Sequence, residues 1–210
     1  MKKISILFLL SFFVFAGSNG FSQKLKSGDL SGLKGQKVIN LQFDYSKMKV
    51  GKYDNEEEYI KNATADRNKK KEGSGEAWAV KWRADETGRY PGAFGDAFNN
   101  KADACGLELK ENATDARYTL IVHTVFLEQG VEAIVAAKAS EVELVVDLVE
   151  TKAPDKAIAS IESSGKGSTT RMSVGGAPVS KETYDAGLRI SQAYETAAKS
   201  LGKFICKELK

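Results

Sequence analysis

The chain has 210 residues, of which 42% are hydrophobic and 28% are charged, and its formal net charge at pH 7 is +3. This length allows one domain with a substantial buried core. The small net charge excludes the strongly basic surface by which proteins bind nucleic acid, so we expect no nucleic-acid partner.

Residues 1–22 have the three parts of a secretory signal peptide. Lys2 and Lys3 precede an apolar run from Ile4 to Ala16, and small and polar residues follow as far as Ser22. The run is shorter than the roughly 20 residues that cross a bilayer, and a retained membrane anchor is the alternative. We predict cleavage after Ser22, no lipid anchor because no cysteine lies nearby, and a periplasmic or secreted protein.

Residues 23–210 are predicted to form a single α/β domain with no stable membrane span after signal removal. Cleavage removes two lysines and no acid, which lowers the net charge from +3 to +1. Residues 23–36 are polar and rich in glycine, which predicts a mobile lead-in, and Lys37 to Asp44 has the apolar and β-branched residues of a first strand. Residues 45–90 form a charged insertion, with room for a short helix near 55–65, that we expect to be mainly solvated.

Apolar periodicity predicts the elements that follow the insertion. Trp78 and Trp82 stand four residues apart, which places them on one face of a helical segment. Pro91 fits the first turn of a helix that runs to Ala104. The nearly continuous apolar run from 117 to 127 indicates a strand that is buried on both faces.

Four further segments complete the predicted order. Residues 131–139 are expected to form a flexible hairpin arm, and the alternation over 142–148 indicates a strand with one face in the core. Another strand spans 156–163, and a polar loop covers 165–180. Ser180 is the predicted cap of a long final helix that ends near Lys207 and carries one apolar stripe.

This order predicts an α+β fold, a two-layer α/β sandwich in which two main helices cover one face of a small mixed sheet. In an alternating path both helices point the same way. Cys105 and Cys206 each lie near the carboxyl end of one of these helices, so we predict that they form a disulfide in an oxidising compartment.

The carboxyl half contains the segments YTLIVHTVFLEQG, ASEVELVVDLVETKAPDKAIASIESSGKG and RISQAYETAAKSLGKFICKELK. Their layout resembles bacterial envelope families of unknown function, related in arrangement to the amino-terminal domain of TolB and to the curli-secretion lipoprotein CsgG. The resemblance covers roughly residues 94–210. It implies three strands and a closing helix, and it brings no catalytic residues. This chain departs from it by lacking a lipidation cysteine and by having the 45–90 insertion.

No group of residues has the spacing of a known catalytic or metal site. His123, the single histidine, has neither a nucleophile nor an acid at a diagnostic spacing, so a structural role is favoured over a catalytic one. His123, Cys105 and Cys206 lack zinc-site spacing, and we expect no metal and no cofactor.

Three other features have a structural and a functional interpretation. The GKGSTT run at 165–170 lacks the earlier glycine of a phosphate loop, which favours a flexible loop. The acids at 54 and 56–58 do not follow the calcium-loop spacing, which favours a solvated charged face. The aromatic residues Trp78, Trp82, Tyr90 and Phe94 are expected in the core, and a carbohydrate- or peptide-binding surface is the alternative.

The sequence therefore predicts an exported, non-catalytic module that binds another macromolecule of the envelope or helps to assemble one, with a protein as the first expectation. Its oligomeric state is open. A cell-surface hydrolase that uses acids such as Asp44 or Asp147 is the first alternative, and it requires carboxylates that converge in a cleft with raised pKa values. A carrier of a small apolar ligand is the second, and it requires a closed apolar pocket.

Overall fold

A computed structural model of the chain describes residues 23–132, 137–167 and 185–210. The predicted signal peptide, residues 1–22, and Ser180 lie outside the described residues. The final helix, Ala186–Glu208, is capped by Asp185, so the prediction of Ser180 as its cap is wrong. Within the described ranges, no helix is both long and apolar enough to cross a membrane.

The main sheet has seven strands in the order β1-β9-β8-β5-β2-β4, and β3 pairs with one end of β5. Neighbours from β1 to β5 run antiparallel, whereas β5, β2 and β4 run parallel. The strands are β1 (Lys24–Gly28), β2 (Val38–Asp44), β3 (Lys49–Val50), β4 (Glu108–Glu111), β5 (Tyr118–Glu128), β8 (Glu141–Glu150) and β9 (Ala153–Lys166). A separate ribbon pairs β6 (Val131–Glu132) with β7 (Ala137–Lys138), within the segment predicted as a hairpin arm.

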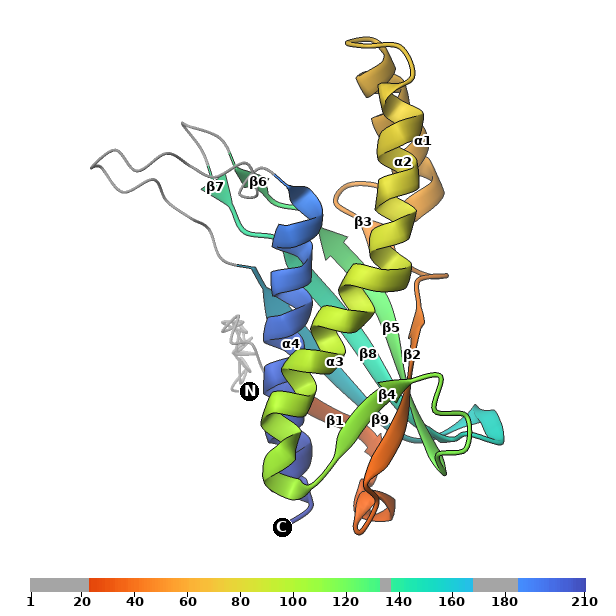
Figure 1. Ribbon diagram of the computed structural model, residues 1–210, viewed down its shortest axis with the longest axis vertical. Helices are drawn as coiled ribbons and strands as arrows, with labels where there is room; N and C mark the ends of the chain where they lie inside the picture. Colours follow the sequence, from red (N-terminus) through yellow and green to blue (C-terminus); the bar gives the residue numbers. More distant parts are fainter. Residues whose placement is uncertain (1–22, 133–136, 168–184) are drawn as a thin grey trace, which may run out of the picture.

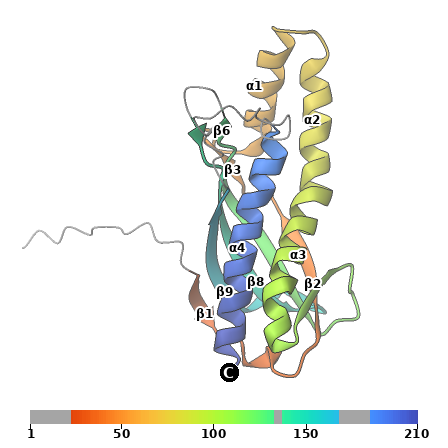
Figure 2. The same cartoon turned by 60° about the vertical axis from the view of Figure 1, so that its left-hand side comes forward.

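Two long helices, α3 (Tyr90–Ala102) and α4 (Ala186–Glu208), lie side by side over one face of this sheet (Figures 1 and 2). Phe94 and Phe98 of α3 and Ile190 of α4 are completely buried, as are Leu120 and Val122 of β5. These side chains belong to one hydrophobic core between the two layers. The architecture is the predicted α+β fold, a two-layer sandwich with both main helices on one face.

The predicted disulfide is present between Cys105 and Cys206, whose Cα atoms lie 5.5 Å apart. Cys105 closes a 3-10 turn, Asp103–Cys105, directly after α3, and Cys206 lies in the last turn of α4. The bond therefore joins the carboxyl ends of two helices that run in the same direction, as the alternating path predicts.

The sequence analysis did not predict the two edge strands, β1 and β4. Residues 23–36 were expected to be a mobile lead-in, which is wrong, because β1 pairs antiparallel with β9 and a 3-10 turn, Ser31–Leu33, follows it. Only Leu25 is even partly buried in β1, and an edge strand of this kind has no apolar alternation to reveal it. Leu30 and Leu33 nevertheless anchor the segment in the core. Strand β4, at the opposite edge, is equally polar.

Strand β5 is buried mainly on one face, in contrast to the prediction of burial on both faces, although Thr119 is also buried on the other side. Leu120, Val122 and Thr124 point into the helix-covered core, whereas Ile121 and His123 alternate with them and remain partly exposed. The β-branched residues that make the run look continuous thus belong to both sides of the strand.

The insertion over residues 45–90 contains two helices where only one short helix was expected, although most of its residues are exposed, in keeping with the prediction of a mainly solvated segment. Helices α1 (Glu56–Asn68) and α2 (Ser74–Ala84) form a hairpin that projects beyond the sheet (Figure 1). Asn55 caps α1 by accepting a hydrogen bond from the Glu58 amide, and acids fill the first turn, where the helix dipole favours them. Charged residues dominate the surface of both helices. The few apolar residues that make contacts are therefore too sparse to form a helical periodicity in the sequence.

Aromatic rings hold the hairpin together. Tyr59 of α1 packs against Trp78 and Trp82 of α2, with ring centroids 5.7 and 5.0 Å away. The two tryptophans therefore share one face of a helix, as their spacing predicts. A π-helical turn, Asp85–Arg89, connects α2 to α3 without a break, so the hairpin and the sheet-covering layer share one helical rod.

Candidate functional site

The sheet face opposite α3 and α4 carries a row of polar side chains from four neighbouring strands. Strand pairing places Asp44 of β2 beside His123 of β5, and Asp147 of β8 beside Ser160 of β9. Laterally paired residues point to the same side of a sheet. We call this set, Asp44, His123, Asp147 and Ser160, the open-face row.

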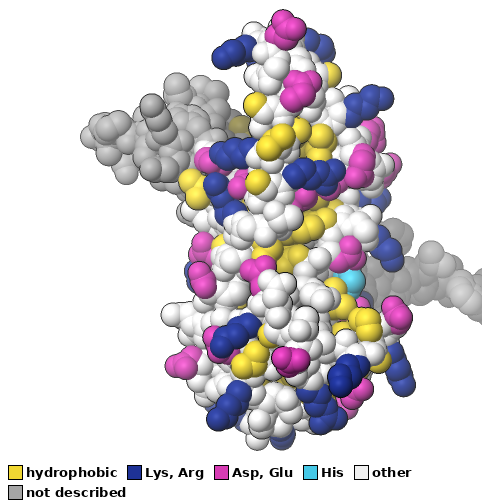
Figure 3. Space-filling model, turned by 45° about the vertical axis from the view of Figure 1, so that its right-hand side comes forward, with side chains coloured by type: hydrophobic (Ala, Val, Ile, Leu, Met, Phe, Trp, Pro, Cys, Tyr) yellow, Lys and Arg dark blue, Asp and Glu magenta, His cyan; other side chains and the backbone are white. Residues whose placement is uncertain are grey.

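His123 is the centre of the open-face row. Its Nδ1 lies 2.7 Å from Oδ2 of Asp44, which is a hydrogen bond, whereas its Nε2 lies 3.5 Å from Oδ2 of Asp147. The three side chains are 24 to 34% exposed. The single histidine is visible at the molecular surface in Figure 3.

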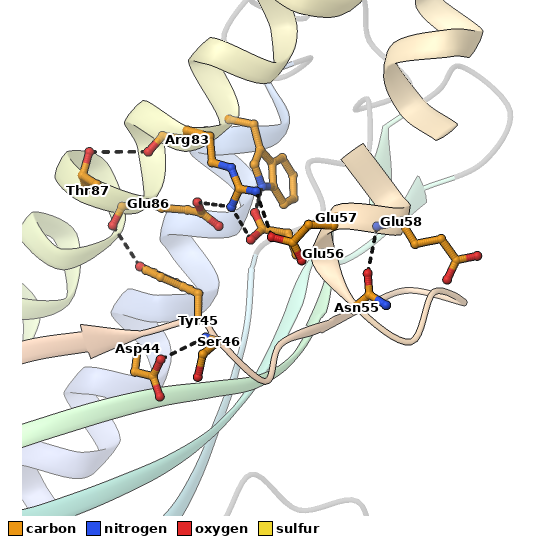
Figure 4. Close-up of polar contacts among 11 residues, drawn as sticks. Asp44, Tyr45, Ser46, Asn55, Glu56, Glu57, Glu58, Arg83, Glu86 and Thr87 are labelled. Carbon is orange, nitrogen blue, oxygen red and sulfur yellow. Dashed lines mark hydrogen bonds and ion pairs between the residues drawn. The ribbon is translucent and has the colours of Figure 1, made fainter. Parts of the chain in front are cut away.

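The two carboxylates of the row are held by further donors. Ser160 Oγ donates to Oδ1 of Asp147 over 2.6 Å, and the Ser46 amide donates to Oδ1 of Asp44 over 2.9 Å (Figure 4). Partial burial alone would raise the pKa of Asp44, but the hydrogen bonds from Ser46 and His123 outweigh it and lower that pKa. Asp44 is thus an ionised acceptor at neutral pH.

A second polar cluster lies at the base of the hairpin. Arg83 of α2 contacts Glu56 of α1 and Glu86 of the π-helical turn, and Trp82 Nε1 also donates to Glu56 (Figure 4). Both carboxylates are almost fully buried, at 4 and 5% exposure. Burial first, and then the neighbouring carboxylate of Glu56, raise the pKa of Glu86 to about 9. Glu86 is therefore protonated at neutral pH.

This hairpin-base cluster is a structural junction. Its members come from α1, α2 and the π-helical turn, and the Tyr45 hydroxyl after β2 donates to the Glu86 carbonyl oxygen over 3.0 Å. The raised pKa of Glu86 thus marks an interior packing site, where a substrate would not reach the carboxyl.

Three hollows of the described surface are lined by residues outside the open-face row. One of about 700 Å³ lies beside α3 and β4, and another of about 700 Å³ lies along α3 and α4. A smaller one, of about 200 Å³, is bounded by the hairpin and the start of α4. Charged and amide side chains line the first, so it does not resemble the closed apolar pocket that a carrier requires.

Other residues singled out in the sequence have structural roles. Gly165 and Lys166 belong to β9, so the expectation of a flexible loop is wrong for these two residues, and residues 168–170 of the same run lie outside the described residues. Gly165 lies against the α4 backbone at Ala193, so no side chain fits there. Tyr90 and Phe94 are core residues, as expected. Among the described residues, no group of three or more His, Cys, Asp or Glu side chains is arranged to hold a metal ion.

The sequence brought forward His123, Asp44 and Asp147 separately and did not place them together. Asp44 and His123 are 79 residues apart, and only the strand register makes them neighbours. Ser160, Arg83 and Glu86 were not recognised as members of polar clusters. Ser160 alternates with the buried residues Ala159 and Ile161, which was the one available indication that it faces away from the core.

No protein-family model matches the chain, and no curated protein sequence does. Among solved structures, the chain is similar to the PelC dodecamer from Paraburkholderia phytofirmans at 9% identity and a TM-score of 0.39, over 85% of this chain and 97% of that one. A PelC variant from the same organism aligns at 10% identity and a TM-score of 0.39, over 86% of this chain and 97% of that one. A likeness at this level carries no inference about function or assembly.

Proposed function

We propose that this protein is an exported, non-catalytic module that binds a partner protein in the bacterial envelope, or outside the cell, through the open face of its sheet. The proposal combines the export signal of the sequence with one structural observation. Both main helices cover the same face of the sheet, and the opposite face, with the open-face row at its centre, is left to other contacts. The resemblance of the sequence pattern to TolB-like and CsgG-like envelope families supports the same proposal.

The chemistry of the open face suits a protein partner. Partly buried Ile121 and Val145 lie among the polar side chains and offer apolar area. Acids lie on the central strands of this face, at Asp44, Glu143 and Asp147, whereas lysines lie on the other strands, at Lys24, Lys26, Lys110 and Lys166, and Lys26 pairs with Glu162 over 2.6 Å. A partner with basic groups opposite the central strands would complement this arrangement, because complementary charge steers association.

The alternative of a hydrolase has less support. It requires a carboxyl with a raised pKa in an accessible cleft, but the pKa of Asp44 is lowered. The carboxyl with the strongly raised pKa, that of Glu86, is buried beneath the hairpin. Asp85 also has a pKa raised by burial and lines the small hollow beside the hairpin, but it pairs with Arg89 over 3.1 Å. Asp44 of the open face and the carboxyls with raised pKa values are therefore different groups, which favours binding over acid-base catalysis at the open face.

Site-specific photo-crosslinking in intact cells tests the proposal. A photoreactive residue replaces Gln42 in one variant and Glu143 in another, since both side chains are exposed on the open face, and it replaces exposed Lys199 of α4 as the control. We expect one discrete adduct from both open-face positions, weaker at raised salt because charge attraction is screened. Identical adducts from Lys199, or none from any position, would exclude the open face as the binding surface.

A further inference from the structure

The contact between His123 and Asp147 has an unusual length. Nε2 of His123 faces Oδ2 of Asp147 at 3.5 Å, which is too long for a good hydrogen bond. A Zn²⁺ ion bound to both atoms at tetrahedral geometry, with bonds of about 2.0 to 2.2 Å, would separate them by about 3.4 Å. The observed spacing fits two ligands on one ion, and it also fits a weak ion pair, so the two must be separated by experiment.

Each of the two atoms is oriented by a separate hydrogen bond. Oδ2 of Asp44 lies 2.7 Å from Nδ1 of His123, and a ring that is protonated at Nδ1 alone has the lone pair of Nε2 free on the side of Asp147. Ser160 Oγ donates to Oδ1 of Asp147 over 2.6 Å and leaves Oδ2 free. A carboxylate behind a histidine is the usual outer-shell partner of a zinc ligand, because it fixes the ring tautomer and raises its basicity.

We propose that His123 Nε2 and Asp147 Oδ2 are ligands of a Zn²⁺-type site on the open face, with Asp44 and Ser160 as positioning residues. No third His, Cys, Asp or Glu ligand comes from the described part of the chain, so the other coordination positions are open to water or to a group from a partner. The side chains are half-exposed, which gives an ion direct access from solvent.

The acids of the central strands favour a cation. Glu143 lies on the same strand and face as Asp147, whereas the lysines of this face, Lys24, Lys26, Lys110 and Lys166, lie on β1, β4 and β9. One imidazole nitrogen and one carboxylate oxygen suit Zn²⁺, whereas Mg²⁺ and Ca²⁺ prefer all-oxygen ligands. The site does not depend on the proposed binding function, because its test uses no partner.

Nuclear magnetic resonance of the ring nitrogens gives a direct test, because His123 is the only histidine. The exported protein, purified without a polyhistidine tag, is labelled with ¹⁵N and titrated with Zn²⁺. We expect a neutral ring with the proton on Nδ1 and a saturable shift of Nε2 on addition of Zn²⁺. Mg²⁺ at the same concentrations leaves the signal unchanged.

Variants separate this site from adventitious binding. Asp147→Asn abolishes the saturable response, Asp44→Asn weakens Zn²⁺ binding by about tenfold or more, and Glu143→Gln, which removes a neighbouring charge, retains it. Two results would overturn the proposal. One is a ring with both nitrogens protonated at neutral pH that ignores Zn²⁺, which means an ion pair with both aspartates. The other is an unchanged Zn²⁺ response in Asp147→Asn, which means binding by the imidazole alone. Open-face crosslinking would be unaffected by either.

Discussion

Glu56 and Glu86 bring two carboxyl groups together beneath the helical hairpin, and one guanidinium, that of Arg83, contacts both. A single cation neutralises one carboxylate, and burial of a second charge is costly. At neutral pH Glu86 is protonated, so of the two carboxyl groups only that of Glu56 is charged. Arg83 neutralises this one charge, and both side chains can stay buried.

This proton makes the stability of the fold depend on pH. The pKa of Glu86 rises from 4.5 to about 9 on folding, so between these values the folded chain holds a proton that the unfolded chain has lost. Stability is then fully present below about pH 4.5 and falls as pH rises toward 9, by at most about 1.4 kcal/mol per pH unit.

Glu86→Gln removes this titration and keeps the shape of the side chain. We expect urea unfolding to show wild-type stability falling between about pH 5 and pH 9, and a much flatter profile for the variant. Fluorescence is a local probe, since both tryptophans, Trp78 and Trp82, lie in α2. Glu57→Gln is the control, because Glu57 also contacts Arg83 but is 78% exposed. Parallel profiles for wild type and Glu86→Gln would show that Glu86 is ionised in the fold.

At the residue scale, the sequence indicated which polar residues deserved attention, but it did not show which of them lie next to one another in the fold. His123 lacks a partner at any diagnostic spacing because its partners stand on other strands, at positions 44 and 147. Their meeting depends on the register of β2, β5 and β8, including a bulge between Thr124 and Phe126 that shifts the β5–β8 register. Such register shifts cannot be read from one sequence.

At the scale of elements, the contact between β9 and α4 depends on a residue without a side chain. A Cβ on Gly165 would meet the backbone of Ala193 and Ala197, so strand and helix approach each other only because glycine stands there. Gly92 of α3 is the opposite case, because a Cβ there has nothing within 4 Å.

The two glycines therefore predict opposite effects of the same substitution. Gly165→Ala should destabilise the protein by about 1 to 3 kcal/mol through overpacking. Gly92→Ala should stabilise it by about 0.5 to 1 kcal/mol, since alanine favours a helix. Chemical denaturation of both variants measures the difference. Equal effects would mean that β9 and α4 adjust freely to an added methyl group.

Elements with strong periodicity were predictable, and polar ones were not. The alternation over 142–148 correctly indicated β8, and the predicted helix from 91 to 104 differs from α3 and its 3-10 turn by a residue at each end. Strands β1 and β4 lie at sheet edges and lack apolar alternation. The α1–α2 hairpin is stabilised by a few aromatic rings and one buried ion pair, which periodicity does not detect.

At the scale of the whole molecule, specific interactions hold α4 to the rest of the helical layer at both of its ends. At the amino end of α4, Asp185 caps the helix and pairs with Lys81 of α2 and with Arg89 of the π-helical turn. At the carboxyl end, the disulfide links α4 to the turn after α3. The two helices therefore form one unit over the covered face, and the sheet presents its other face independently of them.

The disulfide encloses most of the sheet, since 101 residues separate Cys105 from Cys206. Restriction of the unfolded chain by a loop of this size stabilises the fold by about 4 to 5 kcal/mol in the chain-entropy model. We expect replacement of both cysteines by serine to lower the free energy of unfolding by about 2 to 5 kcal/mol. Urea denaturation measures this loss, and dithiothreitol should lower wild-type stability to that of the variant without affecting the variant. Free thiols in the denatured, oxidised protein would instead show that the two helix ends are not bonded, and the covering layer would then rest on packing alone.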